Sequence, residues 1–191
     1  SASLEIKNVD MDAGTLDIYM TNDVAVSALQ FFLTGMTISA VDATVGSATN
    51  LDYLSLNSNA DCDADGQSDV GCNLILAASF GSSFVPVGTS QLLLSVTFAD
   101  YNGGAICFEG IGGEIVGPWS PPAFSDTDGL EITDTEWGDC DCPSSLDDCG
   151  VCGGDSSTCN TIQVSYNTTT PMAGFQFGFA DNDISVFSAS G

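Results

Sequence analysis

The sequence predicts an all-β protein: an antiparallel β-sandwich, then a disulfide-tied linker, then the opening strands of a second, similar module. Three observations support this fold class. Short stretches that alternate apolar and polar residues are separated by turn residues about every 8–12 positions. Hydrophobic residues make up 43% of the 191 residues, which is enough for a core, and no stretch shows a helical period. Finally, one segment of the chain occurs twice.

The repeat aligns Thr15–Val45 with Thr161–Gly191 at a constant offset and without a gap. The aligned pairs that are identical, or that keep an apolar residue, are Thr15/Thr161, Leu16/Ile162, Ile18/Val164, Leu29/Phe175, Gln30/Gln176, Phe31/Phe177, Leu33/Phe179, Ile38/Ile184, Ser39/Ser185 and Ala43/Ala189. Such a repeat indicates a duplicated structural unit. We therefore expect one complete β-module over residues 1–139, a Cys/Gly/Asp-rich linker over 140–159 and a partial second module over 160–191.

The first part of the predicted module contains four strands separated by turn residues: Leu4–Val9, Thr15–Thr21, Ala28–Leu33 and Met36–Ile38. Period-two alternation assigns their inward faces, which carry Leu16, Ile18 and Met20 in the second strand and Leu29, Phe31 and Leu33 in the third. Phe32 breaks this alternation, so we expect it to face a second sheet or a partner.

The second part of the module begins with a small, polar loop over residues 42–60, with one short strand near Leu51–Leu56. Two apolar, β-prone runs are expected to form central strands, Asn73–Phe80 and Gln91–Phe98. The remaining expected strands are short: Ala105–Phe108, Glu114–Val116 and Leu130–Ile132, the last of which closes the module. The prolines within Gly117–Pro122 predict an edge or a loop.

The charge of the chain is strongly acidic, with 26 Asp and Glu residues against one basic residue, Lys7, and a net charge of −25. Such a surface repels nucleic acid and anionic lipid, so neither is expected as a partner. The absence of His and Arg removes the usual general base and the usual anion clamp. Catalysis would have to use carboxylates alone, as in a glycosidase, and because no acid pair stands out for that role we expect no enzyme. A dense set of carboxylates instead favours calcium as the cofactor.

The eight cysteines favour disulfides, and hence an oxidising, extracellular or cell-surface location. Without an initiator Met, a signal peptide or an apolar run of membrane length, the sequence is typical of a processed piece of a secreted chain, with no membrane insertion. The alternative for the Cys149-x-x-Cys152 pair is a redox or zinc site. We favour pairing Cys62 with Cys72 and Cys107 with Cys140, leaving Cys142, Cys149, Cys152 and Cys159 to pair within the linker.

An acidic loop over residues 61–72 has the pattern DxDxDGxxD. Alternate acids in a loop converge on one cation, and glycine permits the sharp turn. The predicted calcium ligands are Asp61, Asp63, Asp65, Gln67 through its carbonyl, and Asp69. A shorter acidic stretch offers a possible second metal site at Asp126 and Asp128. Asn167-Thr168-Thr169 is a glycosylation sequon by pattern.

Three resemblances extend this interpretation. An Asn-Val strand end, a Thr-Leu-x-Ile strand, an Asn-x-x-Val joint and a Leu-Gln-Phe strand resemble the cohesin-like or jelly-roll-like β-sandwich, over about residues 3–135 and again at 161–191. Because Cys72 stands where an EF-hand loop has Glu, the acidic loop instead resembles thrombospondin type 3 repeats. The stretch Asp148–Cys159 resembles the CGVCGGD-x-S-x-C motif of secreted thrombospondin-motif metalloproteases, without their zinc-binding histidines. Together they imply a secreted tandem-repeat surface protein with a rigid spacer.

Two functions follow from the sequence. The apolar residues of the partial module need a partner sheet, so residues 160–191 are possible donor strands for another copy. The assembly residues are then Ile162, Val164, Phe175, Phe177, Phe179 and Ile184. The first hypothesis is therefore a structural subunit of an extracellular filament or adhesive fibre, whose partners are copies of itself. The alternative is a cohesin-like module that binds a protein or glycan target.

Overall fold

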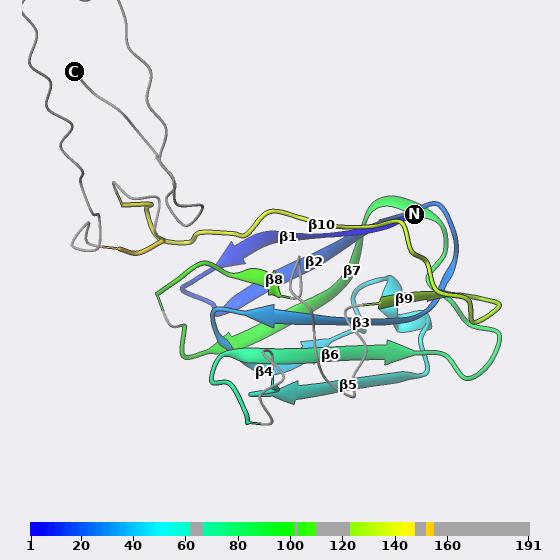
Figure 1. Cartoon of the computed structure of the whole chain (residues 1–191), viewed down its shortest axis with the longest axis horizontal. Helices are drawn as coiled ribbons and strands as arrows, with labels where there is room; N and C mark the ends of the chain where they lie inside the picture. Colours follow the sequence, from blue (N-terminus) through cyan, green and yellow to red (C-terminus); the bar gives the residue numbers. More distant parts are fainter. Residues whose placement is uncertain (62–66, 102, 110–122, 148–151, 155–191) are drawn as a thin grey trace, which may run out of the picture.

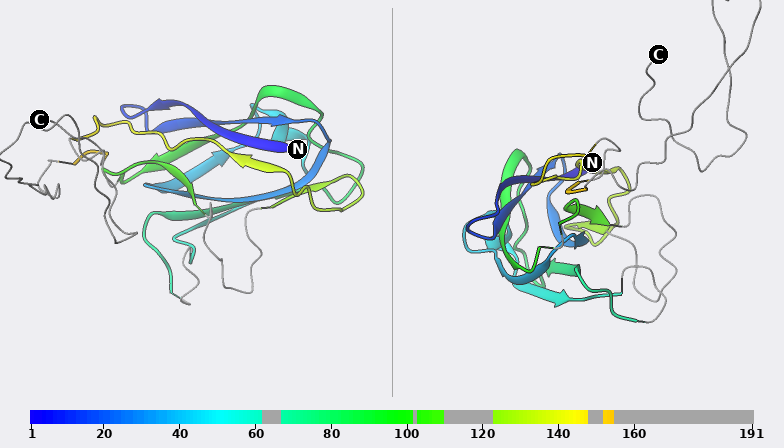
Figure 2. Two further views of the ribbon diagram at one scale, coloured as in Figure 1. Left: turned by 45° about the horizontal axis from the view of Figure 1, so that its top comes forward. Right: turned by 90° about the vertical axis from the view of Figure 1, so that its left-hand side faces the viewer.

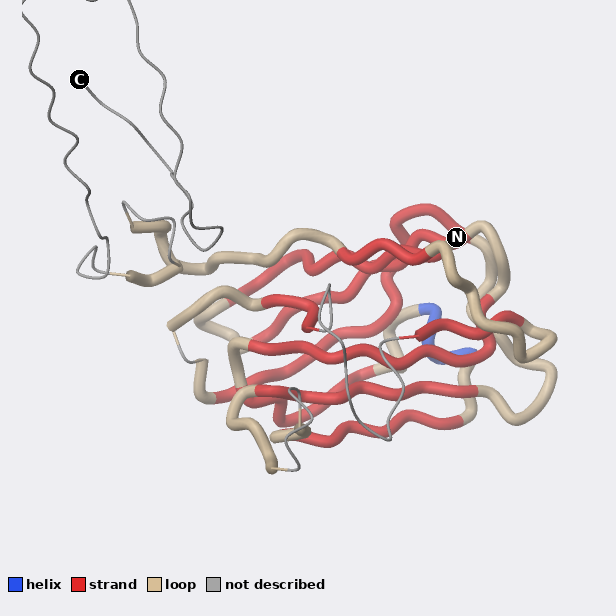
Figure 3. The backbone as a smooth tube through the Cα atoms, viewed as in Figure 1, coloured by secondary structure: helices blue, strands red, loops and turns tan. Residues whose placement is uncertain are grey.

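The fold is a two-layer β-sandwich, as the sequence predicts (Figure 1). The computed structural model describes residues 1–61, 67–101, 103–109, 123–147 and 152–154. Within these ranges the chain forms ten strands and one short 3₁₀ helix, η1 (Ser47–Asn50). Figure 3 shows how little of this part of the chain is helical.

The first sheet has the strand order β10-β1-β2-β7-β4. Its strands are β1 (Ala2–Asp10), β2 (Thr15–Asn22), β4 (Thr37–Asp42), β7 (Gly88–Ala99) and β10 (Thr135–Trp137). In the second sheet β5 pairs with β6, β6 with β3, and β3 with both β8 and β9 on its far side. These strands are β3 (Val26–Thr34), β5 (Tyr53–Ser58), β6 (Cys72–Ala78), β8 (Cys107–Glu109) and β9 (Ala123–Asp126). All pairings are antiparallel except β1 with β10.

The core lies between the sheets and is formed by the inward positions that the alternation predicts. The predicted inward side chains of β2 and β3 are at most 2% exposed: Leu16, Ile18, Met20, Leu29, Phe31 and Leu33. Aromatic packing fills the space between β3, β8, β9 and β10: Phe31 meets Phe108 edge to face at 5.7 Å, and Phe124 stacks on Trp137 at 5.4 Å. Such pairs add to the stability that burial alone provides.

A buried asparagine fixes the corner where the chain passes from β3 in the second sheet to β4 in the first. The Asn73 amide nitrogen donates to the carbonyls of Leu33, Met36 and Gly71, at 3.0, 2.8 and 3.3 Å. Its side-chain oxygen accepts a hydrogen bond from Ile38 N at 3.0 Å. These contacts satisfy backbone groups that the turn leaves unpaired in an apolar interior.

Asn22 has the same role at the crossing from β2 to β3. Its amide nitrogen donates to the Val24 carbonyl at 2.8 Å and to the Pro86 carbonyl at 3.0 Å, and its oxygen accepts from Gln91 Nε2 at 2.8 Å. The joint that begins at Asn22-Asp23-Val24 is therefore a corner that ties β2 and β3 to the β6–β7 loop. At the β3–β4 corner, Gly35 has φ +98°, and a Cβ there would lie 2.4 Å from the Ala105 carbonyl oxygen.

Several predicted boundaries were wrong. β5 begins at Tyr53, two residues later than expected, because Leu51 caps the end of η1; β8 begins at Cys107. β6 ends at Ala78, and Phe80 beyond it is 82% exposed. Leu130–Ile132 makes one isolated bridge, and the closing strand is instead β10, which pairs in parallel with β1. The expected strand at 114–116 and the proline-rich stretch at 117–122 lie outside the described residues.

The module has two distinct ends (Figures 1 and 2). The N-terminus lies at one end, where Ser1 contacts Asp23 in the β2–β3 turn. The described cysteine segment, which we define as residues 140–147 and 152–154, lies at the opposite end, beside Ile106. The chain therefore enters and leaves the sandwich at opposite ends.

Candidate functional site

The acidic loop is closed at its base by backbone hydrogen bonds. Ala60 N donates to the Cys72 carbonyl at 2.9 Å, Asp69 N to the Ala60 carbonyl at 2.9 Å, and Cys72 N to the Asp69 carbonyl at 3.1 Å. Ala60 and Cys72 are buried against Phe32 on the outer face of the second sheet. Phe32, the residue that breaks the alternation of its strand, therefore packs against the base of the acidic loop. This packing and the three backbone hydrogen bonds hold both ends of the loop in place.

The structure places part of the predicted calcium ligand set. Asp61 and Asp69 are half-buried at the two ends of the loop, and the Asp69–Ala60 hydrogen bond holds these ends together; Gln67 is exposed. Asp63, Asp65 and Cys62 lie outside the described residues, whereas Cys72 is disulfide-bonded. Among the residues that the structure describes, no group of three His, Cys, Asp or Glu could hold a metal ion. The described carboxylates fit the hard oxygen donors of a calcium site.

Asp126 has a structural role in the turn that follows β9. Its Oδ1 accepts hydrogen bonds from Asp128 N and Leu130 N, both at 2.9 Å, while Asp126 N donates to the Leu130 carbonyl at 2.9 Å. An aspartate that bonds backbone two residues ahead is typical of an Asx turn. These bonds account for Asp126 without an ion, and the second metal site stays a prediction.

Two described disulfides organise the exit of the chain. Cys107 at the start of β8 is joined to Cys140, with 4.4 Å between their Cα atoms, which is the pairing that the sequence analysis favours. Beside it, Ile106 and Asp141 exchange two backbone hydrogen bonds of 2.9 and 2.8 Å. Cys142 is joined to Cys152 within the cysteine segment; Cys149 and Cys159 lie outside the described residues. The first two residues of the cysteine segment are therefore joined to the sandwich, Cys140 by a disulfide and Asp141 by backbone hydrogen bonds.

Further contacts hold the cysteine segment against the loop between β7 and β8. The Tyr101 hydroxyl donates to the Gly104 carbonyl at 2.6 Å and lies 3.3 Å from Ser144 Oγ and 3.8 Å from Cys152 Sγ. Gly153 has φ +67°, and a Cβ there would lie 2.2 Å from the Gly103 carbonyl oxygen. A larger residue at this position would separate the segment from the sandwich.

The predicted assembly residues and the sequon residue Asn167 lie outside the described residues, as do all of residues 155–191. Their counterparts in the first module are described, because the repeat aligns with β2, β3 and β4. Leu16, Ile18, Leu29, Phe31, Leu33 and Ile38, the counterparts of the six assembly residues, are all core side chains, at most 2% exposed.

The charged side chains for which contacts or pKa shifts are resolved make local contacts at the surface. Lys7 Nζ contacts Glu5 and Ser90 Oγ, each at 2.8 Å, and lies 5.0 Å from the Tyr19 ring centroid. Hydrogen bonds from the Thr44 hydroxyl and N–H lower the pKa of Asp42, and those from the Ser1 ammonium and hydroxyl lower the pKa of Asp23. Both carboxylates are on the surface, where they stay ionised and accept local hydrogen bonds.

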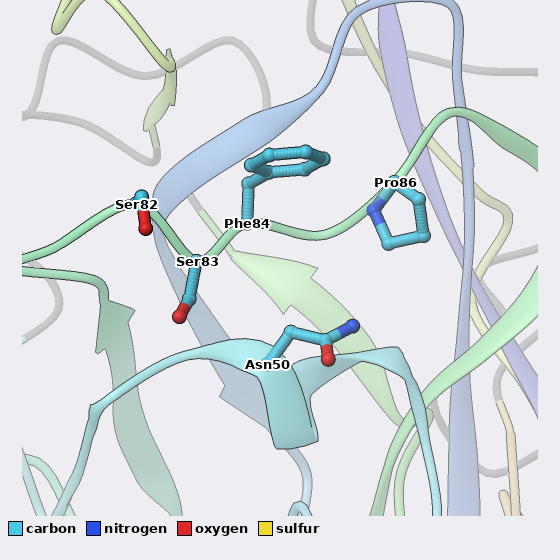
Figure 4. A pocket seen from close by; sticks show the side chains of 5 residues that line it. All are labelled: Asn50, Ser82, Ser83, Phe84 and Pro86. Atoms are coloured by element: carbon cyan, nitrogen blue, oxygen red, sulfur yellow. The ribbon is translucent and has the colours of Figure 1, made fainter.

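The sequence analysis missed a surface with exposed aromatic side chains at the end of the sandwich opposite the cysteine segment. A shallow hollow of about 300 Å³ is lined by Asn50, Ser82, Ser83, Phe84 and Pro86 (Figure 4). Tyr53 and Phe80 form a tilted pair nearby, with ring centroids 6.0 Å apart. The lining contains no ionisable side chain. The relevant sequence signal was the Phe80–Val87 run of Gly, Ser, Phe and Pro, which is too irregular for a strand.

The fold and the disulfides define the class of protein as a disulfide-stabilised all-β sandwich, and the disulfides indicate an oxidising, extracellular environment. A comparison with protein-family models and with curated proteins finds no match. No helix in the described ranges is long and apolar enough to cross a membrane.

Proposed function

We propose that this chain is a structural subunit of an extracellular filament or adhesive surface fibre, assembled head to tail by β-strand donation from residues 160–191 and braced by calcium and disulfides. The observation that carries the proposal is the burial of the repeated positions. Phe31 and Ile38, which recur as Phe177 and Ile184, are 0% and 2% exposed in the first module. The same side chains in the repeat need a sheet to cover them, because an isolated hairpin is marginally stable at best.

The geometry of the module supports linear growth. The chain enters and leaves the sandwich at opposite ends (Figure 1), an arrangement that suits successive copies in a row. A head-to-tail contact between unlike surfaces propagates without closing and makes a fibre. The Cys107–Cys140 disulfide and the Tyr101 contacts hold the start of the linker against the sandwich, which favours one direction for the next unit.

The form of strand donation is constrained by the first module. In this module β2 lies between β1 and β7, β3 lies between β6 and the β8/β9 side, and β4 forms an edge of the first sheet. None of these three positions is vacant. A donated copy of these strands therefore adds to an open edge, by β-augmentation, and does not fill a vacant position.

A charge placed at a core position of the repeat tests the proposal. We expect Phe177→Asp in the full chain to abolish assembly, because its counterpart Phe31 is completely buried and a buried, unpaired carboxylate is costly. Ser188→Asp is the matched control: it adds the same charge outside residues 160–180, at the position aligned with exposed Asp42. Sedimentation velocity measures both. If Phe177→Asp assembled as well as the wild type, strand donation by this segment would be wrong.

Calcium would be held by Asp61 and Asp69 at the loop base, together with Asp63, Asp65 and the Gln67 carbonyl. At a calcium concentration about 100 times the dissociation constant, binding stabilises the folded state by about 2.7 kcal/mol. We expect calcium to raise the melting temperature of the wild type and a chelator to reverse the rise. In the double variant Asp61→Asn/Asp69→Asn the rise should disappear, whereas Asp12→Asn, at an exposed turn residue, should keep it. Calorimetry measures these melting temperatures. If calcium raised the melting temperature of the double variant as much as that of the wild type, the ion would bind elsewhere.

The second candidate is a cohesin-like binding module for a protein or a glycan. It is favoured by the exposed aromatic side chains beside the hollow of Figure 4, since exposed apolar patches commonly mark interaction sites. This candidate requires a chain that stays monomeric at all concentrations and binds a target, so the sedimentation experiment also separates the two functions.

A further inference from the structure

We infer that the outer edge of β5 is the acceptor edge of the assembly, and that it binds a neutral strand from residues 160–180 of a second copy of this chain. The inference rests on the proposed function and deepens it, because it names the surface that receives the donated strand. An open sheet edge presents unpaired backbone groups that can pair with another chain, and the edges of the two sheets differ in how well they could do so.

The edges of the first sheet are short or irregular. β10 has three residues, and beyond its pairing with Leu4 the β1 edge carries Glu5, Lys7 and a register shift between Lys7 and Asp10. On the opposite side, the β4 edge has a register shift between Ile38 and Ala40 and ends at Asp42. Charges, bulges and short strands are the features with which natural edges prevent pairing.

The far edge of the second sheet is also poorly suited to accept a strand. It is made of two short strands, β8 and β9, which share β3 as their partner. An added strand needs a continuous row of backbone donors and acceptors on one line. Two strands of three and four residues do not offer one.

β5 has none of these protective features. Its six residues pair with β6 in a continuous register from Tyr53↔Ala78 to Ser58↔Asn73, with no shift. It contains no charged residue and no proline, although the chain carries 26 acidic residues. Among the described residues, β5 has backbone pairing with β6 alone; its last residue, Ser58, also reaches the other sheet, where its Oγ donates to the Ile38 carbonyl of β4 at 2.7 Å. Figure 1 shows β5 as the outermost strand of its sheet.

Side chains on both faces of β5 would contact an added strand. Leu54 and Leu56 are half-buried and pack against the rim of the core, so a neighbouring strand would complete their burial. On the alternate positions, Tyr53 is 44% exposed and forms its ring pair with Phe80, which is 82% exposed. Cross-strand contacts with aromatic residues stabilise sheet pairing.

The proposed occupant matches this edge in pattern and in charge. Thr161–Tyr166 alternates apolar Ile162 and Val164 with polar residues, which suits an edge strand with one face on the core rim. No charged residue occurs between Asn160 and Ala180. In a chain of net charge −25, two copies repel one another except where neutral segments meet, so a neutral strand is favoured on a neutral edge.

Hydrogen–deuterium exchange on the full chain tests the acceptor directly. We expect the amides of β5 to gain protection as the protein concentration rises and assembly proceeds, while the amides of β4 and β10 stay unchanged. Protection that appears at a different edge would overturn β5 as the acceptor and leave the fibre intact. Protection of β5 at every concentration, in a monomer, would show that the segment pairs within its own chain and would overturn pairing with a second copy. Absence of assembly would overturn both proposals.

A pair of rim substitutions provides the matched test. Leu56→Lys places an ammonium where the donated strand must lie, and we expect the concentration needed for assembly to rise about tenfold or more. Val41→Lys makes the same change at a half-buried rim residue of the β4 edge and should leave that concentration within about twofold. Circular dichroism checks that both variants fold. If Leu56→Lys assembled like the wild type while Phe177→Asp did not, strand donation would stand and β5 would be excluded.

Discussion

Replacing Asn73 with alanine is expected to lower the free energy of unfolding by about 3 kcal/mol, because each unsatisfied buried polar group costs about 1–3 kcal/mol. The side chain is completely buried and serves the Leu33 and Met36 carbonyls and the Ile38 N–H at the β3–β4 corner. Removing it leaves these groups without their partner and opens a cavity. Thermal unfolding should show a decrease in melting temperature of about 10 °C.

Asn57→Ala is the matched control, since Asn57 is an exposed asparagine on the neighbouring strand β5. Surface substitutions of this kind usually change stability by less than about 0.5 kcal/mol. If the two variants had equal stability, the buried amide would not be what fixes the corner.

The second large effect is expected from removing the disulfide between Cys107 and Cys140. The bridge closes a loop with a sequence separation of 33 residues, and the loop-entropy relation gives about 3–4 kcal/mol of stabilisation for that length. The double variant Cys107→Ser/Cys140→Ser should therefore unfold at a clearly lower denaturant concentration. It should also release the cysteine segment, which loses its covalent attachment to β8.

The double variant Cys142→Ser/Cys152→Ser separates these two consequences. That bridge has a sequence separation of 10 residues and lies within the cysteine segment. Its loss should increase proteolysis of the segment while the unfolding midpoint of the sandwich changes far less. Equal midpoints for both double variants would contradict the assignment of Cys107–Cys140 as the bridge that stabilises the sandwich.

The strands with strict alternation could be predicted from the sequence alone. β2 and β3 have one face in the core and register set by that face, so period-two patterning identified their inward residues. At these positions local pattern and tertiary packing agree. Phe32, the exception, was expected to face a second sheet or a partner, but it instead faces the small cluster that supports the acidic loop.

Elements whose position depends on distant parts of the chain could not be predicted. β10 is three residues long and exists because Thr135–Trp137 pairs with Ala2–Leu4, far away in sequence. In the sequence Asn73 is a single polar residue near the start of an apolar strand. Its role, which is to bond the backbone of the β3–β4 corner, depends on the fold that brings this corner next to it. Leu130 was expected in a strand, yet the Asp126 turn leaves it 64% exposed.

The candidate site was predictable to a similar degree. The pairing Cys107–Cys140 was favoured from the sequence as a bridge across the sandwich edge, and the structure contains it. The Tyr101 and Gly153 contacts that dock the cysteine segment depend on shape and left no sequence pattern. The acidic loop was recognisable from its alternating aspartates, while the support of its base by Phe32 required the fold.

Negative-stain electron microscopy of the purified full chain, with calcium and then with a chelator, tests the central claim most directly. Strand donation into a neighbouring copy predicts filaments that form with calcium and fray on chelation. Discrete particles of a single small size in both conditions, at concentrations where sedimentation also shows a monomer, would contradict the assembly and leave a stand-alone binding module.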